Sequence, residues 1–199
     1  MRERVVGNVR DLPTYGYGPA SPIWWGTLAF IALEGTGFVL AAAAYLFLHF
    51  MNADFPLSAP PTELYWGTAV TVVMLLSAWP NHLAKKNGER ENLAGSRRDL
   101  VIMTLFGLAL LALRAFEFRA LNVRWDQNAY GSMIWVLLGL HTTHLLTDFG
   151  DTLVLTVLMF TRHARGKRFS DVSDNAFYWY FVVASWLPIY ALIYWLPRW

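Results

Sequence analysis

Long apolar segments alternate along this chain with short segments rich in charged residues. We expect the apolar segments to form five helices, at residues 23–51, 64–83, 100–121, 133–160 and 176–196. Each reaches the roughly 20 residues that a helix needs to cross about 30 Å of hydrocarbon. An open strand at that depth would leave its backbone polar groups unpaired in lipid. The pattern therefore predicts an all-α integral membrane protein, a bundle of five transmembrane helices.

The polar segments between these helices are short, and no repeat or low-complexity stretch interrupts the chain. Residues 1–199 are therefore expected to form a single five-helix transmembrane domain. Basic residues precede the first apolar segment, as they do in a signal peptide. That segment is much longer than the roughly 7–15 apolar residues of a signal core. We therefore expect it to be kept as the first helix.

Composition supports this class, because 56% of the residues are hydrophobic and only 15% are charged. The formal net charge of +2 gives no basis for nucleic-acid binding, and no nucleic-acid partner is expected. The sequence contains no cysteine, which excludes disulfides and thiolate metal sites.

Lysine and arginine gather in alternate polar segments, and this asymmetry predicts the orientation of the chain. On one side the basic residues are Arg2, Arg4, Arg10, Lys85, Lys86, Arg90, Arg97, Arg98, Arg162, Arg165, Lys167 and Arg168. The opposite side has only Arg119, Arg124 and Arg198, and Arg114 falls within a helix. Since basic loops stay in the cytoplasm, we expect the N-terminus inside and the C-terminus outside.

Two histidines and two aspartates interrupt the fourth apolar segment: His141, His144, Asp148 and Asp151. On a helix their spacing places them within an arc of about 80°, so they form one polar stripe. Ionisable groups within a membrane are costly and mark functional sites. The stripe could supply metal ligands, but all its members lie on one helix. A compact site would need ligands from other helices, so no metal site is assigned.

Further polar residues lie in the other apolar segments. Glu34 is the lone carboxyl group of the first, either as a hydrogen-bonded packing element or on a proton route. Arg114 and Glu117 are spaced i, i+3 in the third, which favours an ion pair that fixes packing. His82 falls at the expected inner membrane edge, where a histidine is typically a hydrogen-bond donor. No nucleophile–base pair or phosphate-binding glycine loop is discernible, so no catalytic residue is assigned.

Five motifs follow one another along nearly the whole chain. They are Trp25-Gly26 leading into Leu33-Glu34-Gly35, Trp79-Pro80-Asn81-His82, Phe116-Glu117-Phe118, Tyr130-Gly131-Ser132 with Gly139, His141 and His144, and the aromatic ending Phe177-Tyr178-Trp179-Tyr180-Phe181 to Trp195. In this order and spacing they resemble subunit III of the haem–copper oxidases, in its short five-helix bacterial form.

The resemblance implies an accessory subunit of a cytochrome c oxidase in aerobic electron transport, with no redox centre of its own. Such a subunit packs against catalytic subunit I and, we expect, subunit II. It holds membrane lipids at the shared surface and supports proton uptake. Haem and copper are then expected in the partner subunits, and none is bound by this chain. The implied location is the bacterial plasma membrane, with multiple spans.

The resemblance also implies roles for the polar residues. Glu34 becomes the carboxyl near the contact with the catalytic subunit, a candidate for a proton route. The remaining residues become buried polar or lipid-proximal groups: His82, Arg114, Glu117, His141, His144, Asp148 and Asp151.

The chain departs from the family pattern at Tyr180, Val183, Asp148 and Asp151. These changes suggest a divergent branch and leave open an accessory subunit of a quinol oxidase or a nitric oxide reductase. A different class also stays open, namely a small independent membrane protein that binds haem or metal through His141, His144 and Asp148.

Overall fold

The computed structural model describes residues 15–52, 55, 60–162 and 164–198, so Arg2, Arg4 and Arg10 lie outside the described residues. The described residues contain five long helices and no strand, which confirms the all-α class. The helices are α1 (Pro22–Met51), α2 (Leu64–Glu89), α3 (Leu93–Arg119), α4 (Ala129–Met159) and α5 (Lys167–Tyr190). A 3₁₀ turn (Gly18–Ala20) precedes α1, and a π-helical turn (Ala191–Trp195) and a 3₁₀ turn (Leu196–Arg198) follow α5.

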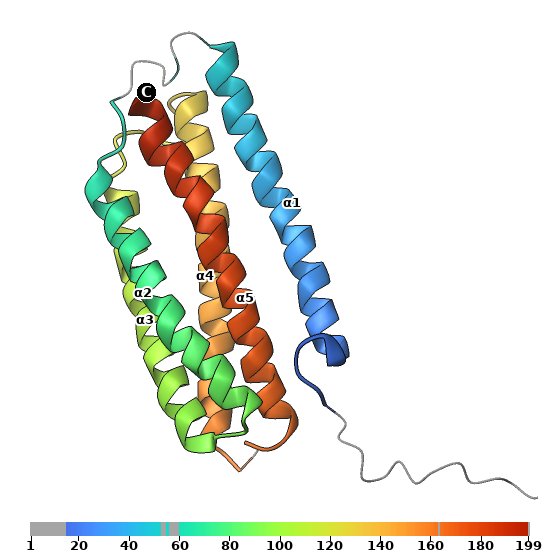
Figure 1. Ribbon diagram of the computed structural model, residues 1–199. Helices are drawn as coiled ribbons and strands as arrows, with labels where there is room; N and C mark the ends of the chain where they lie inside the picture. The colour runs from blue at the N-terminus through green and yellow to red at the C-terminus, as the bar shows by residue number, and fades with distance from the viewer. Residues whose placement is uncertain (1–14, 53–54, 56–59, 163, 199) are drawn as a thin grey trace, which may run out of the picture.

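Three helical segments in the described chain are long and apolar enough to cross a membrane: Pro22–Met51, Leu93–Arg119 and Lys167–Arg198. The chain is thus a membrane protein by length and composition. Helices α2 and α4 contain no stretch as apolar as those three segments, but their 26 and 31 residues extend for about 39 and 46 Å. They lie alongside the other helices for most of that distance (Figure 1).

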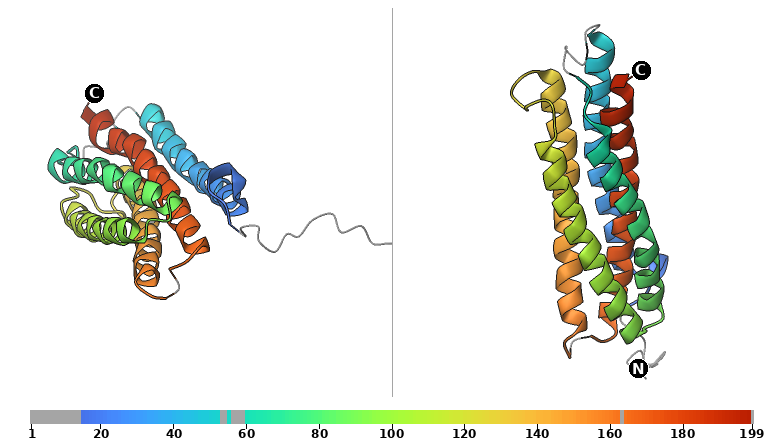
Figure 2. Two further views of the ribbon diagram at one scale, coloured as in Figure 1. Left: turned by 60° about the horizontal axis from the view of Figure 1, so that its bottom comes forward. Right: turned by 90° about the vertical axis from the view of Figure 1, so that its left-hand side faces the viewer.

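Helices α2 to α5 form an antiparallel bundle, and α1 stands at its edge against α4 and α5 (Figure 1). The α2–α3 and α4–α5 connections lie at one end of the bundle, and the C-terminus lies at the other (Figures 1 and 2). Of the described α1 residues only Phe38 and Tyr45 are buried. Leu33 and Phe50 are 71% and 76% exposed. Most of the α1 surface therefore faces away from the chain's own core.

The helices extend further than the apolar segments predict. The second continues to Glu89 instead of ending at 83, the third begins at Leu93 instead of 100, and the fifth begins at Lys167 instead of 176. These expected bounds were wrong because hydropathy marks only the apolar part of a helix. Backbone hydrogen bonds and side-chain caps continue a helix into polar sequence. Asn92, for example, caps the start of α3, because its side chain accepts a hydrogen bond from the Gly95 N–H over 3.2 Å.

Among the described residues, three buried hydrogen bonds of polar side chains cross the interface between α2 and α5. The amide of Asn81 donates to the Ala176 carbonyl over 2.9 Å. The Trp179 indole donates to Ser77 over 2.9 Å, and the Trp186 indole to Thr71 over 2.7 Å. These bonds satisfy buried polar groups and fix the register of the two helices.

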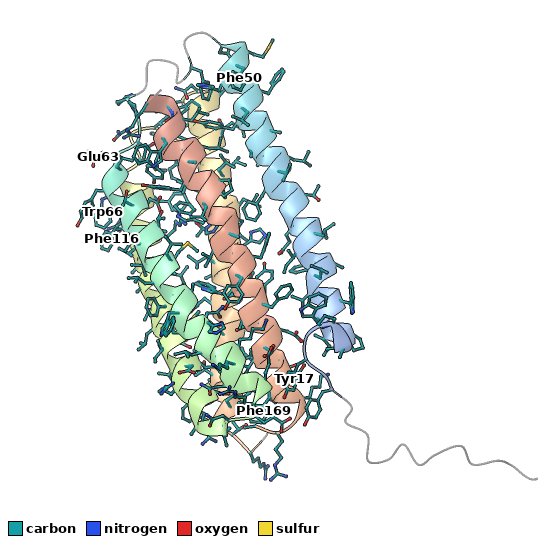
Figure 3. All side chains as sticks on the ribbon, in the orientation of Figure 1. Tyr17, Phe50, Glu63, Trp66, Phe116 and Phe169 are labelled. Carbon is teal, nitrogen blue, oxygen red and sulfur yellow. The ribbon has the colours of Figure 1, made fainter. Side chains whose placement is uncertain are left out.

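Aromatic packing and small residues bring the neighbouring helices close together. Trp66 of α2 stacks on Phe116 of α3, with ring centroids 5.2 Å apart (Figure 3). A Cβ added at Gly67 would lie 2.3 Å from the Tyr194 ring. The absence of a side chain at position 67 therefore makes room for the end of the chain beside α2.

Candidate functional site

Arg114, Glu117 and His141 form a fully buried polar network. Arg114 Nη1 donates to Glu117 Oε2 over 2.6 Å, and its Nη2 lies 3.1 Å from His141 Nδ1. A guanidinium can only donate, so Nδ1 accepts and the His141 ring hydrogen is on Nε2. That nitrogen lies 3.0 Å from the Val182 carbonyl of α5, to which it donates. The network thus joins α3, α4 and α5.

Aromatic side chains complete the surroundings of this ion pair. The guanidinium carbon of Arg114 lies 4.2 Å from the Trp186 ring centroid, a cation–π contact. The Tyr194 hydroxyl donates to the Glu117 oxygen that Arg114 leaves free. Buried charges are tolerated when they are paired and hydrogen-bonded, as both are here. The arrangement joins the helices through a buried ion pair and its hydrogen bonds.

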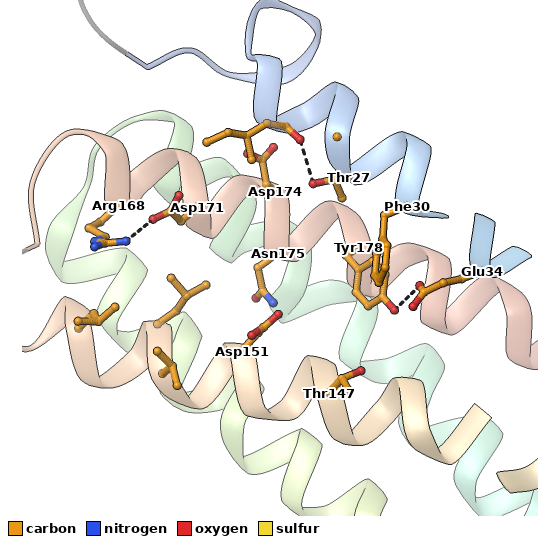
Figure 4. A pocket seen from close by; sticks show the side chains of 15 residues that line it. Thr27, Phe30, Glu34, Thr147, Asp151, Arg168, Asp171, Asp174, Asn175 and Tyr178 are labelled. Carbon is orange, nitrogen blue, oxygen red and sulfur yellow. Dashed lines mark hydrogen bonds and ion pairs between the residues drawn. The ribbon is translucent and has the colours of Figure 1, made fainter. Parts of the chain in front are cut away.

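Glu34, His144 and Tyr178 form a second network, between α1, α4 and α5. Tyr178 donates to Glu34 Oε2 over 2.6 Å (Figure 4). The other carboxyl oxygen of Glu34 lies 3.3 Å from His144 Nε2. His144 Nδ1 lies 2.7 Å from the Leu140 carbonyl. The network attaches the peripheral helix α1 to the bundle through a single carboxyl group.

An open cleft of about 710 Å³ lies between α1, α4 and α5, and Glu34 and Tyr178 line it (Figure 4). Its other acidic lining residues are Asp151, Asp171 and Asp174. Asp171 accepts from Arg168 over 2.8 Å, so one of these carboxylates is paired. Neither carboxyl oxygen of Asp174 has a hydrogen-bond partner among the described residues. The cleft is therefore acidic.

The polar stripe of α4 divides between different neighbours. His141 faces α3 and α5, and His144 faces Glu34 of α1. Asp148 is buried, and its Oδ1 has no hydrogen-bond partner among the described residues. Asp151 is exposed and lines the cleft. A stripe that is continuous in sequence thus serves a packing network at one end and an acidic cleft at the other.

His82 belongs to neither network. It lies on the surface, where its Nδ1 is 3.4 Å from the Tyr180 hydroxyl, a weak contact at most. The structure therefore joins Arg114 with Glu117 and His141, and Glu34 with His144, and leaves His82 apart.

The donor set of the two buried histidines does not fit a haem or a metal ion. Each of the four ring nitrogens of His141 and His144 already has a polar partner within the chain. A metal would have to displace one of the two partners of each histidine that it bound. Among the described residues no group of three or more histidines, aspartates or glutamates could hold a metal ion.

Sequence reasoning missed the partners that α5 and the π-helical turn after it supply. Tyr178 donates a hydrogen bond to Glu34, and Tyr194 donates one to Glu117. From the sequence, tyrosines in this aromatic-rich C-terminal segment were expected to be packing or interfacial residues. Asp171 and Asp174 were missed because the fifth segment was expected to begin at 176. Their spacing of i, i+3 and i+7 relative to Tyr178 places all three on one helix face, and this signal could have found them.

Comparison with known proteins gives a consistent result. The profile of the family described as "Cytochrome c oxidase subunit III" matches residues 67–198. The chain is 26% identical over 176 residues to cytochrome c oxidase subunit 3 of Thermostichus vulcanus, covering 87% of both chains. It is 27% identical over 175 residues to that of Synechocystis sp., covering 85% of this chain and 74% of the relative. A probable cytochrome c oxidase subunit 3 of Mycobacterium tuberculosis is 29% identical over 147 residues, covering 69% and 70%.

Proposed function

Because the chain belongs to the cytochrome c oxidase subunit III family, we propose that it stabilises the catalytic subunit of a respiratory haem–copper oxidase from within the membrane. The resemblance seen in the sequence is thereby confirmed, and the chain is a non-catalytic subunit III of an oxidase complex. The observation that carries the proposal is the family match over residues 67–198. It includes α3 to α5 and hence the whole Arg114–Glu117–His141 network.

In this proposal all five helices span the bacterial plasma membrane as one domain, residues 1–199, with the N-terminus inside. Its support is the fold, which brings the basic α2–α3 and α4–α5 connections to one end of the bundle (Figure 1). Basic residues near the ends of spans stay on the cytoplasmic side. The acidic cleft opens in the half of the bundle nearest that end, since it is lined by the start of α1 and the start of α5.

The proposed partners are subunits I and II of the oxidase and membrane lipids, and haem and copper belong to those subunits. The exposed apolar face of α1 supports a role in contact with lipid or protein, because large apolar surfaces mark such interfaces. The engaged ring nitrogens of His141 and His144 are consistent with an accessory role.

For the polar residues we propose two roles. Glu34 is the contact or proton-route residue, since it lines the cleft and connects α1 to the bundle. The remaining residues act as buried polar or lipid-proximal groups: His82, Arg114, Glu117, His141, His144, Asp148 and Asp151. In this proposal the complex takes up protons during aerobic electron transport, and the subunit supports that uptake.

A second candidate is an accessory subunit of a quinol oxidase or nitric oxide reductase. Asp148 and Asp151 favour it, since they stand where the family pattern has small or apolar residues. The two aspartates would place the chain in a divergent branch of the family. The electron donor of a quinol oxidase or nitric oxide reductase differs from that of a cytochrome c oxidase.

Purification of the tagged chain from membranes in mild detergent tests the proposal. Mass spectrometry of the eluate is expected to identify a large membrane protein with the six or more histidines that two haems and a copper require. The electron-donor class follows from the other subunits that accompany it. A chain that elutes alone and monodisperse would contradict the proposal.

A further inference from the structure

Residues 15–20, which we call the strap, connect the start of α1 to the turn between α2 and α3. The Tyr15 hydroxyl donates a hydrogen bond to Glu91 Oε1 over 3.0 Å, and the Tyr17 hydroxyl donates one to the same oxygen over 3.2 Å. Glu91 lies between the end of α2 and the start of α3. Two hydroxyl groups of the strap therefore share one carboxyl oxygen of a turn that is distant in the sequence.

The strap is also attached to the beginning of α5. The Ser170 hydroxyl donates to the Gly16 carbonyl over 2.7 Å. The Tyr15 ring lies close to Gly166, where an added Cβ would come within 2.9 Å of it. Tyr17 packs on a buried apolar cluster to which α2, α3, α4 and α5 all contribute, at the end of the bundle where Figure 3 labels it. The strap thus joins α1 to the connections at this end.

The backbone of Glu91 has a conformation that suits glycine better than glutamate. Its φ is 53°, and it is the only non-glycine residue with a positive φ in the part of the chain that the structure describes. The Glu91 N–H bonds to the Gly88 carbonyl, and the Asn92 N–H bonds to the Asn87 carbonyl, each over 2.9 Å. These two bonds form the Schellman motif, in which glycine is the usual residue at the position of Glu91. The strained residue is the one that both tyrosines bind, and strain of this kind gives reason to look for a function.

The first half of α1 has few attachments apart from the strap. The open cleft separates it from α4 and α5 as far as Glu34 (Figure 4). Trp24 and Phe30 stack on rings of α5, with centroids 5.4 and 6.0 Å apart. Beyond Glu34, by contrast, Phe38 and Tyr45 are buried in the core. The first half of α1 can therefore move while its second half stays packed.

We propose that the strap and Glu91 form a latch that sets the distance between the first half of α1 and the rest of the bundle, and hence the width of the acidic cleft. In the closed state both tyrosines bind Glu91, and the strap holds α1 beside α5. When these hydrogen bonds break, the first half of α1 moves outward and the cleft widens, while the half beyond Phe38 keeps its place.

The latch can open without any change in the buried networks. Glu91 is exposed at the end of the bundle, whereas the Arg114–Glu117–His141 network lies inside it. A partner that opens the latch has to bind the open form more tightly than the closed one. The inference goes beyond the proposed function, since every contact that carries it lies within this chain.

Distances between spin labels test the latch in the full chain, purified with whatever accompanies it and returned to lipid. Ala29→Cys with Val157→Cys, both at exposed positions, reports the first half of α1 against the end of α4. Phe47→Cys with Val136→Cys, also exposed, reports the opposite ends of the same two helices and is the control pair. The wild-type chain contains no cysteine, so its labelled preparation gives the background from accompanying proteins.

We expect one narrow distance distribution for each pair when Glu91 is present. Glu91→Gly removes the carboxylate and relaxes the turn, because glycine adopts a positive φ freely. It should give the first pair a second population at longer distances and leave the control pair unchanged. Tyr15→Phe/Tyr17→Phe removes both donors and should do the same. Glu89→Gln is the matched control, since the Glu89 carboxylate accepts from Ser173 of α5 and not from the strap, and both distributions should persist.

Three results would overturn the inference. One is a first-pair distribution that stays the same in Glu91→Gly and in the double tyrosine variant. Another is an equal shift of both label pairs, which would mean that α1 does not move at one end. The third is a shift in Glu89→Gln as large as that in Glu91→Gly. None of these results bears on the proposed function, whereas a chain that purifies without an oxidase would contradict the proposed function alone.

Discussion

Arg114 Nη2 donates a hydrogen bond to His141 Nδ1 over 3.1 Å and so joins α3 to α4 within the core. The side chain of Arg114 is only 1% exposed, as is that of its ion-pair partner Glu117. The charges are therefore stable only as a set, and the removal of one member leaves another unpaired.

Arg114→Met tests this dependence. It leaves Glu117 buried without its cation, and loss of one partner of a buried pair costs about 3–5 kcal/mol. We expect a large fall in thermal stability in detergent, measured by fluorescence-detected gel filtration. Arg114→Met/Glu117→Leu removes both charges and should regain part of the loss. Equal melting of the single and double variants would contradict the account.

His141→Leu removes one acceptor and one donor without removing a charge. Arg114 Nη2 and the Val182 carbonyl lose their partner, and unsatisfied buried groups cost about 1–3 kcal/mol each. Thr143→Val is the matched control, because this exposed hydroxyl bonds only to the carbonyl of its own helix turn at Gly139. A thermal shift no larger than that of the control would show that His141 is dispensable for packing.

Two glycines of α4 provide a matched steric test. A Cβ at Gly131 would lie 2.2 Å from the Arg124 carbonyl oxygen, which is backbone and cannot move aside cheaply. A Cβ at Gly139 meets nothing within 4 Å. Gly131→Ala should therefore destabilise by about 1–3 kcal/mol or more. Gly139→Ala should be neutral or stabilise by up to about 1 kcal/mol through helix propensity. Similar melting temperatures for the two variants would contradict the close contact between Gly131, at the start of α4, and the Arg124 carbonyl.

The segment before α1 is expected to respond to alkaline pH. The Tyr17 hydroxyl lies 3.2 Å from Glu91 Oε1, and burial, with the nearby Glu91 charge, raises the Tyr17 pKa above its ordinary value of 10.0. A raised pKa in the folded state gives stability that is present below about pH 10 and lost as the pH rises further. Tyr17→Phe should remove this late-titrating phenol from the ultraviolet absorbance titration. A Tyr17 phenol, seen as the difference between the wild-type and variant titrations, with its midpoint near pH 10 would contradict the contact.

Glu34→Gln tests the role of the carboxyl in the complex. The amide oxygen can still accept from the Tyr178 hydroxyl, so assembly with the partner subunits should persist. Turnover of the oxidase, or its decay during sustained catalysis, should change by several-fold, because the amide cannot exchange a proton. Unchanged turnover at neutral and alkaline pH would reduce Glu34 to a packing residue.

The five helices could be predicted from sequence because long, mainly apolar segments alternate with short polar ones, although only three helical segments of the described chain are apolar enough by themselves to cross a membrane. Their ends could not, since capping by residues such as Asn92 continues α3 into polar sequence. The pairing of Arg114 with Glu117 follows from local spacing and was foreseeable. The separation of His141 from His144 was not. Two residues within one arc face different helices, and only the packing of α1, α3 and α5 decides which partner each one meets.

The most direct test of the central claim is a reduced-minus-oxidised visible spectrum of the tagged chain with whatever accompanies it in mild detergent. The account predicts haem bands that arrive with a large partner and disappear when harsh detergent strips that partner away. Haem retained by the isolated chain, or a complex without haem, would contradict an accessory subunit of a haem–copper oxidase.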